Sequence, residues 1–223
     1  MKVKSWHPAR SELRPSMIRD QEKIKAVIFD WGGVCCKEGE PFASLDLQYT
    51  LAMTPEQIAT AAKALYDGYY IGAYDRNSFW RAIIAHFGLK ENAAINPDAL
   101  SKAYLDSYEI YSDVFATLRK LKKKYLLGLL SNLTPEMRDE VHPRHALGTY
   151  FDATVYSCDD NVRSMKPAAK PYEIILGRLH VKPKECLFID NSPANISAAQ
   201  SLCFQTMLFI SVSRFLEDIA FLL

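Results

Sequence analysis

A run of apolar residues that ends in an aspartate constrains the fold of this chain more than any other segment. Residues 26–29 read Ala-Val-Ile-Phe, and Asp30 follows them directly. An unbroken apolar run is typical of a strand buried on both faces, as in a parallel sheet. The Asp30 carboxylate then lies at the carboxyl end of the strand, where open α/β sheets bind ligands and where a carboxylate can act as a nucleophile. Gly32 and Gly33 let the backbone approach a bound group closely, although an aspartate in a turn or helix cap gives the same pattern.

A second apolar run, at residues 126–130, ends in two small hydrogen-bonding residues, Ser131 and Asn132. Thr134 followed by Pro135 is a helix start signal, with the threonine as cap and the proline in the first turn. A hydroxyl and an amide just before the amino end of a helix suit the binding of an anion. Ordinary turn chemistry is the alternative explanation for this segment.

Two further segments add charge. Lys166 precedes Pro167, and its compact ammonium group can neutralise a phosphate and a nearby carboxylate together. The apolar run 186–189 ends in Asp190 and Asn191, whose oxygens suit a hard cation such as Mg²⁺. Each segment also has a structural explanation, because a lysine before proline is usually a solvated loop residue and an aspartate at a strand end can cap a helix.

Strand and helix patterns alternate over much of the chain, which predicts a parallel sheet with helices on both faces. After the first strand, further strands are predicted near residues 125–130, 153–157, 186–190 and 206–210.

From about residue 40 to residue 110 the pattern is helical instead. Thr54 and Gln57 have capping-box spacing, Gly88 ends an apolar helical stripe, and Asn96-Pro97 starts another helix. This stretch also holds an aromatic cluster, for which core packing and the lining of a substrate pocket are the two alternatives. The cluster consists of Tyr69, Tyr70, Tyr74, Phe79 and Trp80.

The four segments, in this order, resemble the haloacid dehalogenase superfamily, most of whose members are phosphohydrolases. The resemblance spans residues 24–210 and is strongest to the subgroup whose first motif reads Asp-x-Gly-Gly/Asn-Val. That subgroup includes sugar-phosphate phosphatases and the N-terminal phosphatase domain of bifunctional epoxide hydrolases. The resemblance implies an α/β fold, with a Rossmann-like parallel sheet, helices on both faces and an inserted helical cap.

This organisation divides the chain into three parts. The α/β core domain is expected at residues 23–38 and 110–223, and the helical cap at residues 39–109. Residues 1–22 are polar and basic, and we expect a flexible tail there.

The resemblance also implies a role for each motif residue. Asp30 would be the nucleophile that attacks phosphorus, and Lys166 would balance the charge of the phosphoryl group. Substrate binding would fall to Gly33, Ser131 and Asn132. The Mg²⁺ ligands would be the Asp30 carboxylate, the Gly32 carbonyl, and the side chains of Asp190 and Asn191. This is the physics of phosphoryl transfer, in which positioning and charge neutralisation supply the catalysis.

Two positions depart from the family pattern. Most phosphatases of the superfamily carry a second aspartate two residues after the nucleophile, as general acid and base, whereas this chain has Gly32. Loss of a general acid lowers a rate by roughly 10²–10⁴-fold, yet relatives with glycine here are still regarded as phosphatases. Many relatives have an aspartate where this chain has Asn191, so the expected Mg²⁺ site holds less negative charge.

We therefore expect a Mg²⁺-dependent phosphohydrolase of a small phosphorylated metabolite, acting through an aspartyl phosphate on Asp30. Gly32 and Asn191 keep a second hypothesis open, a catalytically impaired member of the fold that binds a phosphorylated ligand or a protein partner. A third is metal-independent carbon–halogen hydrolysis, because dehalogenases of the superfamily also lack the second aspartate. Asp190 and the glycine pair favour the phosphohydrolase over this third hypothesis.

Charge and composition exclude other classes of partner. The 27 Lys and Arg residues nearly match the 26 Asp and Glu residues, for a net charge of +1, so nothing indicates binding to nucleic acid. No apolar run approaches the roughly 18 residues of a membrane span, so no membrane partner is expected. The five cysteines lack metal-ligand spacing and favour buried thiols in a reducing compartment, hence a cytoplasmic protein. The sequence leaves the oligomeric state open, with a homodimer as one alternative.

Overall fold

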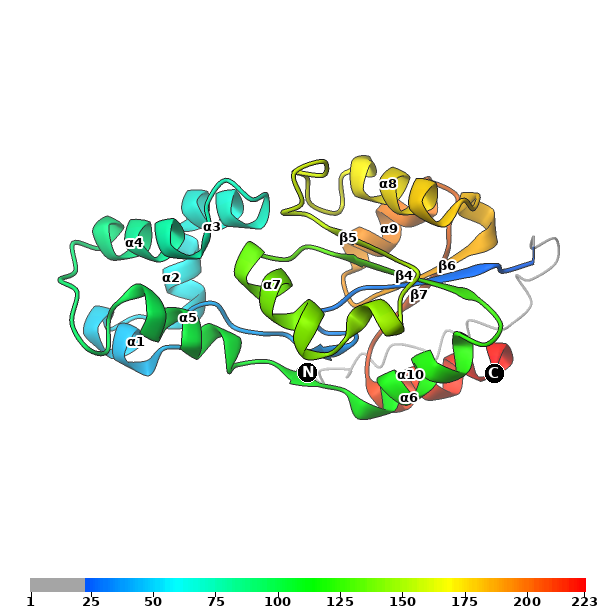
Figure 1. Ribbon diagram of the computed structural model, residues 1–223, viewed down its shortest axis with the longest axis horizontal. Helices are drawn as coiled ribbons and strands as arrows, with labels where there is room; N and C mark the ends of the chain where they lie inside the picture. The colour runs from blue at the N-terminus through cyan, green and yellow to red at the C-terminus, as the bar shows by residue number, and fades with distance from the viewer. Residues whose placement is uncertain (1–22) are drawn as a thin grey trace, which may run out of the picture.

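The computed structural model describes residues 23–223, and the flexible tail expected at residues 1–22 lies outside this range. Its main sheet consists of β1 (Ala26–Phe29), β4 (Leu126–Ser131), β5 (Ala153–Tyr156), β6 (Cys186–Asp190) and β7 (Gln205–Leu208). The five strands are parallel, in the order β5-β4-β1-β6-β7 (Figure 1). The α/β fold class and its Rossmann-like parallel sheet are thereby confirmed.

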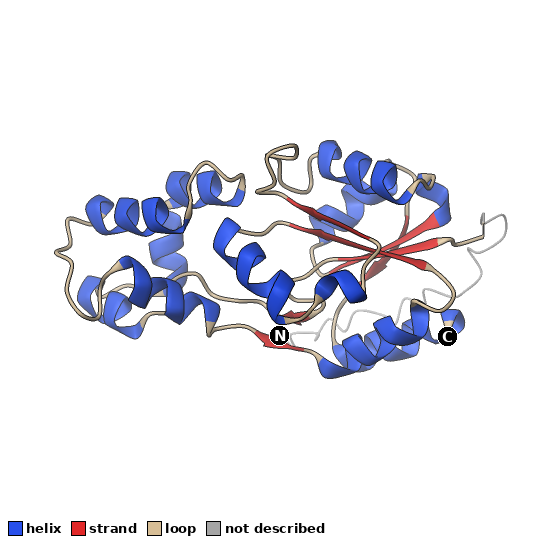
Figure 2. Ribbon diagram, in the orientation of Figure 1, coloured by secondary structure: helices blue, strands red, loops and turns tan. Residues whose placement is uncertain are grey.

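Helices cover both faces of this sheet (Figure 2). They are α6 (Ser112–Leu121), α7 (Pro135–Arg144), α8 (Ala169–Leu179), α9 (Pro193–Ser201) and α10 (Val212–Asp218). Short 3-10 turns lie at Leu147–Thr149, Pro183–Glu185 and Ile219–Leu222. Val27 and Phe29 pack on the face shared with α6 and α10, whereas Ala26 and Ile28 pack on the face shared with α8 and α9. All four side chains are fully buried, so β1 is buried on both faces, as its unbroken apolar run predicts.

A second group of helices follows β1 in the chain. It comprises α1 (Leu45–Leu51), α2 (Pro55–Ala61), α3 (Lys63–Tyr70), α4 (Arg76–His86) and α5 (Pro97–Leu105). These helices lie together beside one end of the sheet, at the left of Figure 1. The chain enters the group after β2 (Cys36–Lys37) and leaves it at β3 (Glu109–Ile110), and these two short strands pair antiparallel. We propose that this pair marks the junction between the α/β core and the cap expected at residues 39–109.

Local signals in the sequence explain where several of these helices begin and end. Thr54 and Gln57 form the predicted capping box at the start of α2. Asn96 caps α5 by accepting hydrogen bonds from the backbone of its first turn. Gly88 follows α4 with a φ of +62°, a left-handed conformation that favours glycine.

Buried polar contacts fasten this helical group to the core. The carboxylate of Glu136, on α7, is 5% exposed and accepts hydrogen bonds from Trp80 Nε1 (3.2 Å) and Ser101 Oγ (2.7 Å). Ser157, which follows β5, donates its hydroxyl to the Tyr70 carbonyl at 2.6 Å. Because Tyr70 is the last residue of α3, this bond holds the end of α3 against the loop after β5.

The aromatic cluster divides between the two roles left open by the sequence. Tyr69, Phe79 and Trp80 are buried in the core, whereas Tyr70 lines the cavity described below. Of the five free thiols, Cys203 is exposed, contrary to the expectation that all five are buried. Within residues 23–223, no helix combines the length and the apolar character needed to cross a membrane.

Candidate active site

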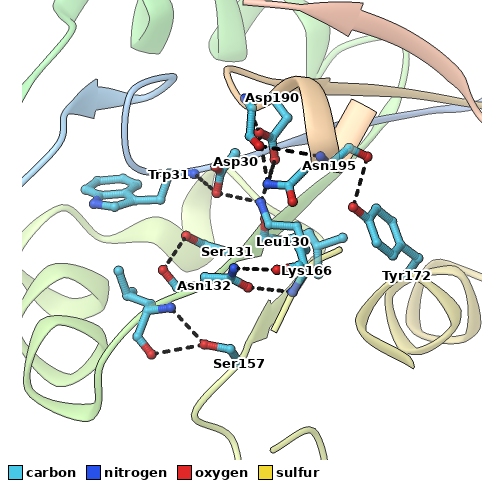
Figure 3. Close-up of polar contacts among 12 residues, drawn as sticks. Asp30, Trp31, Leu130, Ser131, Asn132, Ser157, Lys166, Tyr172, Asp190 and Asn195 are labelled. Carbon is cyan, nitrogen blue, oxygen red and sulfur yellow. Dashed lines mark hydrogen bonds and ion pairs between the residues drawn. The ribbon is translucent and has the colours of Figure 1, made fainter. Parts of the chain in front are cut away.

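The register of the central strands brings the predicted site residues together. Phe29 on β1 pairs with Leu129 on β4 and with Ile189 on β6. The next residues along the three strands are Asp30, Leu130 and Asp190, which therefore lie level with one another at the carboxyl edge of the sheet (Figure 3). Such an edge is where open α/β sheets bind ligands.

Lys166 lies at the centre of this group. Its Nζ contacts Asp30 Oδ1 at 2.8 Å, Asp190 Oδ2 at 2.7 Å and the Leu130 carbonyl at 2.8 Å. The residue is 4% exposed, so the ammonium group is buried between two carboxylates. The alternative that Lys166 is a solvated loop residue is therefore wrong.

Asn132 fixes the backbone of the lysine. Its Nδ2 donates to the Lys166 carbonyl at 3.0 Å, and its Oδ1 accepts from the Lys166 backbone N–H at 2.8 Å. Both halves of the amide are thus used to hold the loop that carries Lys166, a positioning role that the sequence does not reveal. Asn132 also lines the cavity next to Ser131, just before α7, which Thr134 caps.

The Asp30 carboxylate has one engaged oxygen and one free oxygen. Oδ1 accepts from the Trp31 backbone N–H at 2.7 Å and from Lys166. Within residues 23–223, no hydrogen bond or ion pair uses Oδ2. Burial raises the pKa of Asp30 to about 6, with Lys166 opposing this shift and the nearby Asp190 adding to it. Oδ2 is therefore the oxygen available to attack a substrate.

Asp190 differs from Asp30 because both of its oxygens are engaged. Oδ1 accepts from the Ser192 backbone N–H at 2.8 Å, and Oδ2 accepts from Lys166. Asn195 Nδ2 donates to both oxygens, at 3.1 and 3.0 Å. The residue is fully buried, so its contacts orient Lys166 and the first turn of α9.

Asn195 is a site residue that the sequence analysis does not identify. It lies on the first turn of α9, and its carbonyl accepts a hydrogen bond from the Tyr172 hydroxyl of α8 at 3.0 Å. The sequence does contain a signal for Asn195, because an asparagine at a buried helical position needs polar partners. The acid on the preceding strand is the nearest partner.

A cavity of about 340 Å³ opens above these groups. Its core side is lined by Asp30, Gly32, Ser131, Asn132, Met165, Lys166, Asn191, Ser192 and Asn195. Its opposite side is lined by Tyr66, Asp67 and Tyr70, and Glu38 lies between the two sides, beside Gly32. Tyr66, Asp67 and Tyr70 belong to α3, so the helical group supplies one wall of the cavity and the α/β core supplies the floor.

The two glycines after Asp30 have different surroundings. Gly33 has a φ of +76°, and a β-carbon there would lie 2.1 Å from Asn191 Nδ2. Only glycine fits at this position, where it makes room for Asn191. Gly32 lines the cavity, and a β-carbon on it would lie 3.2 Å from Glu38 Cγ. Glu38 therefore stands beside the position where many relatives carry their second aspartate.

The donor set fits a magnesium ion only in part. The candidate ligands are the Asp30 carboxylate, the Gly32 carbonyl and the Asn191 amide, whereas both Asp190 oxygens are engaged by protein donors. Among the described residues, no three His, Cys, Asp or Glu side chains are placed to hold one metal ion. Mg²⁺ is commonly bound by one or two carboxylates together with substrate phosphate. These residues therefore fit Mg²⁺ when a phosphate group adds its oxygens.

Comparison with protein families places the chain in one of them. The model of the haloacid dehalogenase-like hydrolases matches residues 24–202. The chain is a haloacid dehalogenase-like hydrolase. It is also 29% identical, over 111 residues, to (S)-2-haloacid dehalogenase 4A of Burkholderia cepacia. That match covers 49% of this chain and 47% of the dehalogenase, so the chain spans about half the length of this curated relative.

Solved structures of the hydrolase family share the fold. A predicted HAD-like family hydrolase of Porphyromonas gingivalis has a TM-score of 0.72 and 24% identity, over 90% of this chain and 98% of its own. A haloacid dehalogenase family enzyme of Bacteroides thetaiotaomicron, in complex with magnesium and inorganic phosphate, has a TM-score of 0.70 and 22% identity. That match covers 83% of this chain and 93% of the enzyme. At these identities the likeness establishes the fold alone.

Proposed function

We propose that this hydrolase is a Mg²⁺-dependent phosphohydrolase of a small phosphorylated metabolite and that it acts through an aspartyl phosphate on Asp30. The observation that carries the proposal is the geometry of Asp30. Its Oδ1 is fixed by Trp31 and Lys166, while its Oδ2 is free at the floor of a cavity. A carboxylate held in this way has one orientation and one oxygen available for attack.

In the first step, Asp30 Oδ2 attacks phosphorus, and the bond from phosphorus to the alcohol oxygen breaks. Lys166 and the Ser131 hydroxyl stabilise the negative charge on the phosphoryl oxygens. In the second step, water attacks the same phosphorus atom, releases inorganic phosphate and regenerates the carboxylate. Asn132 and Asp190 act through Lys166, because their contacts hold its backbone and its ammonium group in place.

Position 32 supplies no proton to the departing alcohol, because glycine has no side chain. An acidic alcohol, such as the p-nitrophenol of p-nitrophenyl phosphate, leaves without that proton. We therefore expect this ester to be turned over faster than alkyl phosphates, by roughly the 10²–10⁴-fold that a general acid contributes.

Asp30, the Gly32 carbonyl and Asn191 would hold Mg²⁺ in this proposal, with phosphate oxygens completing the coordination. The ion would supply positive charge at the phosphoryl group. The complex of the Bacteroides enzyme with magnesium and phosphate supports this assignment by analogy of fold.

Carbon–halogen hydrolysis is the second candidate, favoured by the match to the Burkholderia dehalogenase and by the absence of a side chain at position 32. A 2-haloacid carries a carboxylate that its enzyme has to bind. Among the described residues lining the cavity, Lys166 is the one cation, and two carboxylates already engage it. A bound Mg²⁺ would supply the missing positive charge to a phosphoryl group, whereas a dehalogenase that needs no metal would lack it, and this favours the phosphohydrolase.

Product release separates the candidates. The proposal predicts that p-nitrophenyl phosphate releases phosphate with Mg²⁺ and that chelation of the metal abolishes this release. Halide release from 2-chloropropionate without metal would favour the dehalogenase instead. No turnover of either substrate, or of a broad panel of phosphorylated metabolites, would favour a binding or regulatory protein.

A further inference from the structure

Two carboxylates give the cap-side wall of the cavity a negative charge, and the core acts on one of them, Glu38, through both the attraction of Lys166 and the repulsion of Asp190. Glu38 and Asp67 line this wall together with Tyr66 and Tyr70. Within the described lining of the cavity, the one cation is Lys166, whose side chain is 1% exposed and paired with Asp30 and Asp190. A substrate group that reaches the wall therefore meets carboxylates and phenol rings, and no free cation.

Glu38 is the less compensated of the two wall carboxylates. Its side chain remains exposed to solvent at the cavity, and within residues 23–223 it makes no hydrogen bond or ion pair. Asp67, in contrast, forms an ion pair with Lys63 at 2.5 Å. Any attraction that the wall exerts on a cation should therefore come mainly from Glu38.

The two tyrosines add aromatic surface beside this carboxylate. Their rings meet edge to face at a centroid distance of 4.8 Å, and their hydroxyls lie 3.0 Å apart. Burial is the main cause of the raised pKa of both phenols, and the charge of Glu38 contributes to the shift at each. Glu38 is thus close enough to both phenols for its charge to affect them. A carboxylate next to aromatic rings is a combination that attracts ammonium groups, through charge and through cation–π contact.

We propose that Glu38, with Tyr66 and Tyr70, selects phosphomonoesters whose alcohol carries an ammonium group, that is, phosphorylated amino alcohols. The phosphate would lie at Asp30 on the floor and the ammonium group at the wall. Leaving groups with a carboxylate or a second phosphate are disfavoured, because the wall repels them. This inference rests on the proposed phosphohydrolase function and adds a substrate class to it.

Three esters of equal chain length isolate the charge of the leaving group. They are 2-aminoethyl phosphate, 2-hydroxyethyl phosphate and phosphoglycolate, which carry an ammonium, a hydroxyl and a carboxylate group. Their kcat/KM values are measured with Mg²⁺ on the native protein. Their binding to the Asp30→Asn variant is measured by calorimetry, which needs no turnover. We expect the aminoethyl ester to be preferred over the hydroxyethyl ester by about tenfold, and phosphoglycolate to be the poorest ligand.

Substitutions of the wall carboxylates test whether the wall causes this preference. Glu38→Gln should bring the aminoethyl and hydroxyethyl esters to within about twofold of each other, since the uncompensated charge is gone. Asp67→Asn should have a smaller effect, because Lys63 already balances Asp67. Glu40→Gln is the matched control, since Glu40 lies on the same segment, is exposed and does not line this cavity. It should leave the preference unchanged.

The outcomes separate this inference from the function on which it rests. Turnover of p-nitrophenyl phosphate with no preference among the three esters would overturn the selectivity and leave the phosphohydrolase standing. Equal losses for all three esters in Glu38→Gln would show that Glu38 serves the chemical step, which also overturns the selectivity. Failure of all three esters to bind Asp30→Asn, together with no turnover by the native protein, would overturn both.

Discussion

The floor and the cap-side wall of the cavity differ in how completely their polar groups are paired. On the floor, Lys166 Nζ makes three polar contacts, and both oxygens of Asp190 are engaged. On the wall, Glu38 has no hydrogen bond or ion pair within the described residues, and Tyr66 and Tyr70 bond to each other. Buried and fully paired groups hold a single geometry, whereas unpaired groups remain available to a ligand. We therefore propose that the chemistry takes place at the floor and that the wall sets the selectivity.

The largest effect is expected when the floor loses its cation. Lys166→Met leaves Asp30 and Asp190 facing each other and leaves the Leu130 carbonyl without this donor. Removing one partner of a buried ion pair costs about 3–5 kcal/mol of unfolding free energy. Phosphate release should fall to background, as measured alongside urea denaturation.

Lys170→Met is the control for this variant, because Lys170 is exposed on the first turn of α8. It should change the unfolding free energy by less than about 0.5 kcal/mol. Equal stability and equal activity of Lys166→Met and Lys170→Met would show that the ion pairs of the floor contribute to neither property. The proposed difference between the floor and the wall would then be wrong.

The raised pKa of Asp30 gives the floor a pH dependence. Attack needs the carboxylate, whose pKa is raised by burial to about 6, so kcat/KM should fall about tenfold per pH unit below that value. The folded state also holds more protons than the unfolded state between the ordinary pKa of 3.8 and about 6. Stability should therefore decrease as pH rises through this window.

Asp30→Asn should remove the contribution of Asp30 to that decrease, because an amide does not titrate. Rate profiles corrected for ionisation of the ester, and urea denaturation of both proteins at several pH values, check the two effects. A rate that stays constant from well above to well below pH 6 would show that Asp30 is not the ionising group.

A smaller effect is expected where the helical group is fastened to the α/β core. Glu136→Gln places an amide N–H₂ where the carboxylate accepts from Trp80 Nε1 and Ser101 Oγ. One buried donor then loses its acceptor, which costs about 1–3 kcal/mol. Thermal denaturation measures the loss. The control, Glu140→Gln on the same helix, removes a surface ion pair with Arg144 and should cost less than about 1 kcal/mol. Equal losses would show that Glu136 does not fasten the two parts.

The smallest effect concerns the metal. Asn191→Asp adds a negative charge beside the proposed ligands, and the Mg²⁺ concentration needed for half-maximal activity should fall by about fivefold, since roughly 1 kcal/mol is typical of such a charge. Asn191 does not cap α9, because the Ser192 side chain accepts the hydrogen bond of that cap. Little change in stability is therefore expected. Identical Mg²⁺ titrations of the two proteins would remove Asn191 from the metal site.

The two acids of the floor were predictable from the sequence because each follows a buried strand. Apolar runs predict the strands, parallel pairing brings their carboxyl ends to one edge, and Asp30 and Asp190 follow from that geometry. The positioning contacts were not predictable, because the amide of Asn132 and the side chain of Asn195 find their partners only in the folded chain. A local pattern contains no information on which side chain a buried amide will bond.

The wall was harder to predict, because it depends on how one helix lies relative to the sheet. The sequence gives helical spacing for α3, but Tyr69 is buried in the core whereas the next residue, Tyr70, lines the cavity. Glu38 belongs to a loop and follows a strand of two residues, which no periodicity marks. The Glu38 side chain lies close to Gly32 because of tertiary packing, in the space that is open because Gly32 has no side chain.

Single turnover of p-nitrophenyl phosphate in water enriched in the heavy oxygen isotope tests the central claim, that Asp30 attacks phosphorus. Mass spectrometry then follows the isotope in the released phosphate and in the peptide that contains Asp30. We expect heavy oxygen in the phosphate and none in Asp30, because water attacks the phosphorus of the aspartyl phosphate. We also expect the Asp30 peptide to carry a phosphoryl group when turnover is quenched in acid, which direct attack by water does not produce, and no turnover by Asp30→Asn. An Asp30 peptide that carries no phosphoryl group when turnover is quenched in acid, or turnover retained by Asp30→Asn, would contradict the central claim.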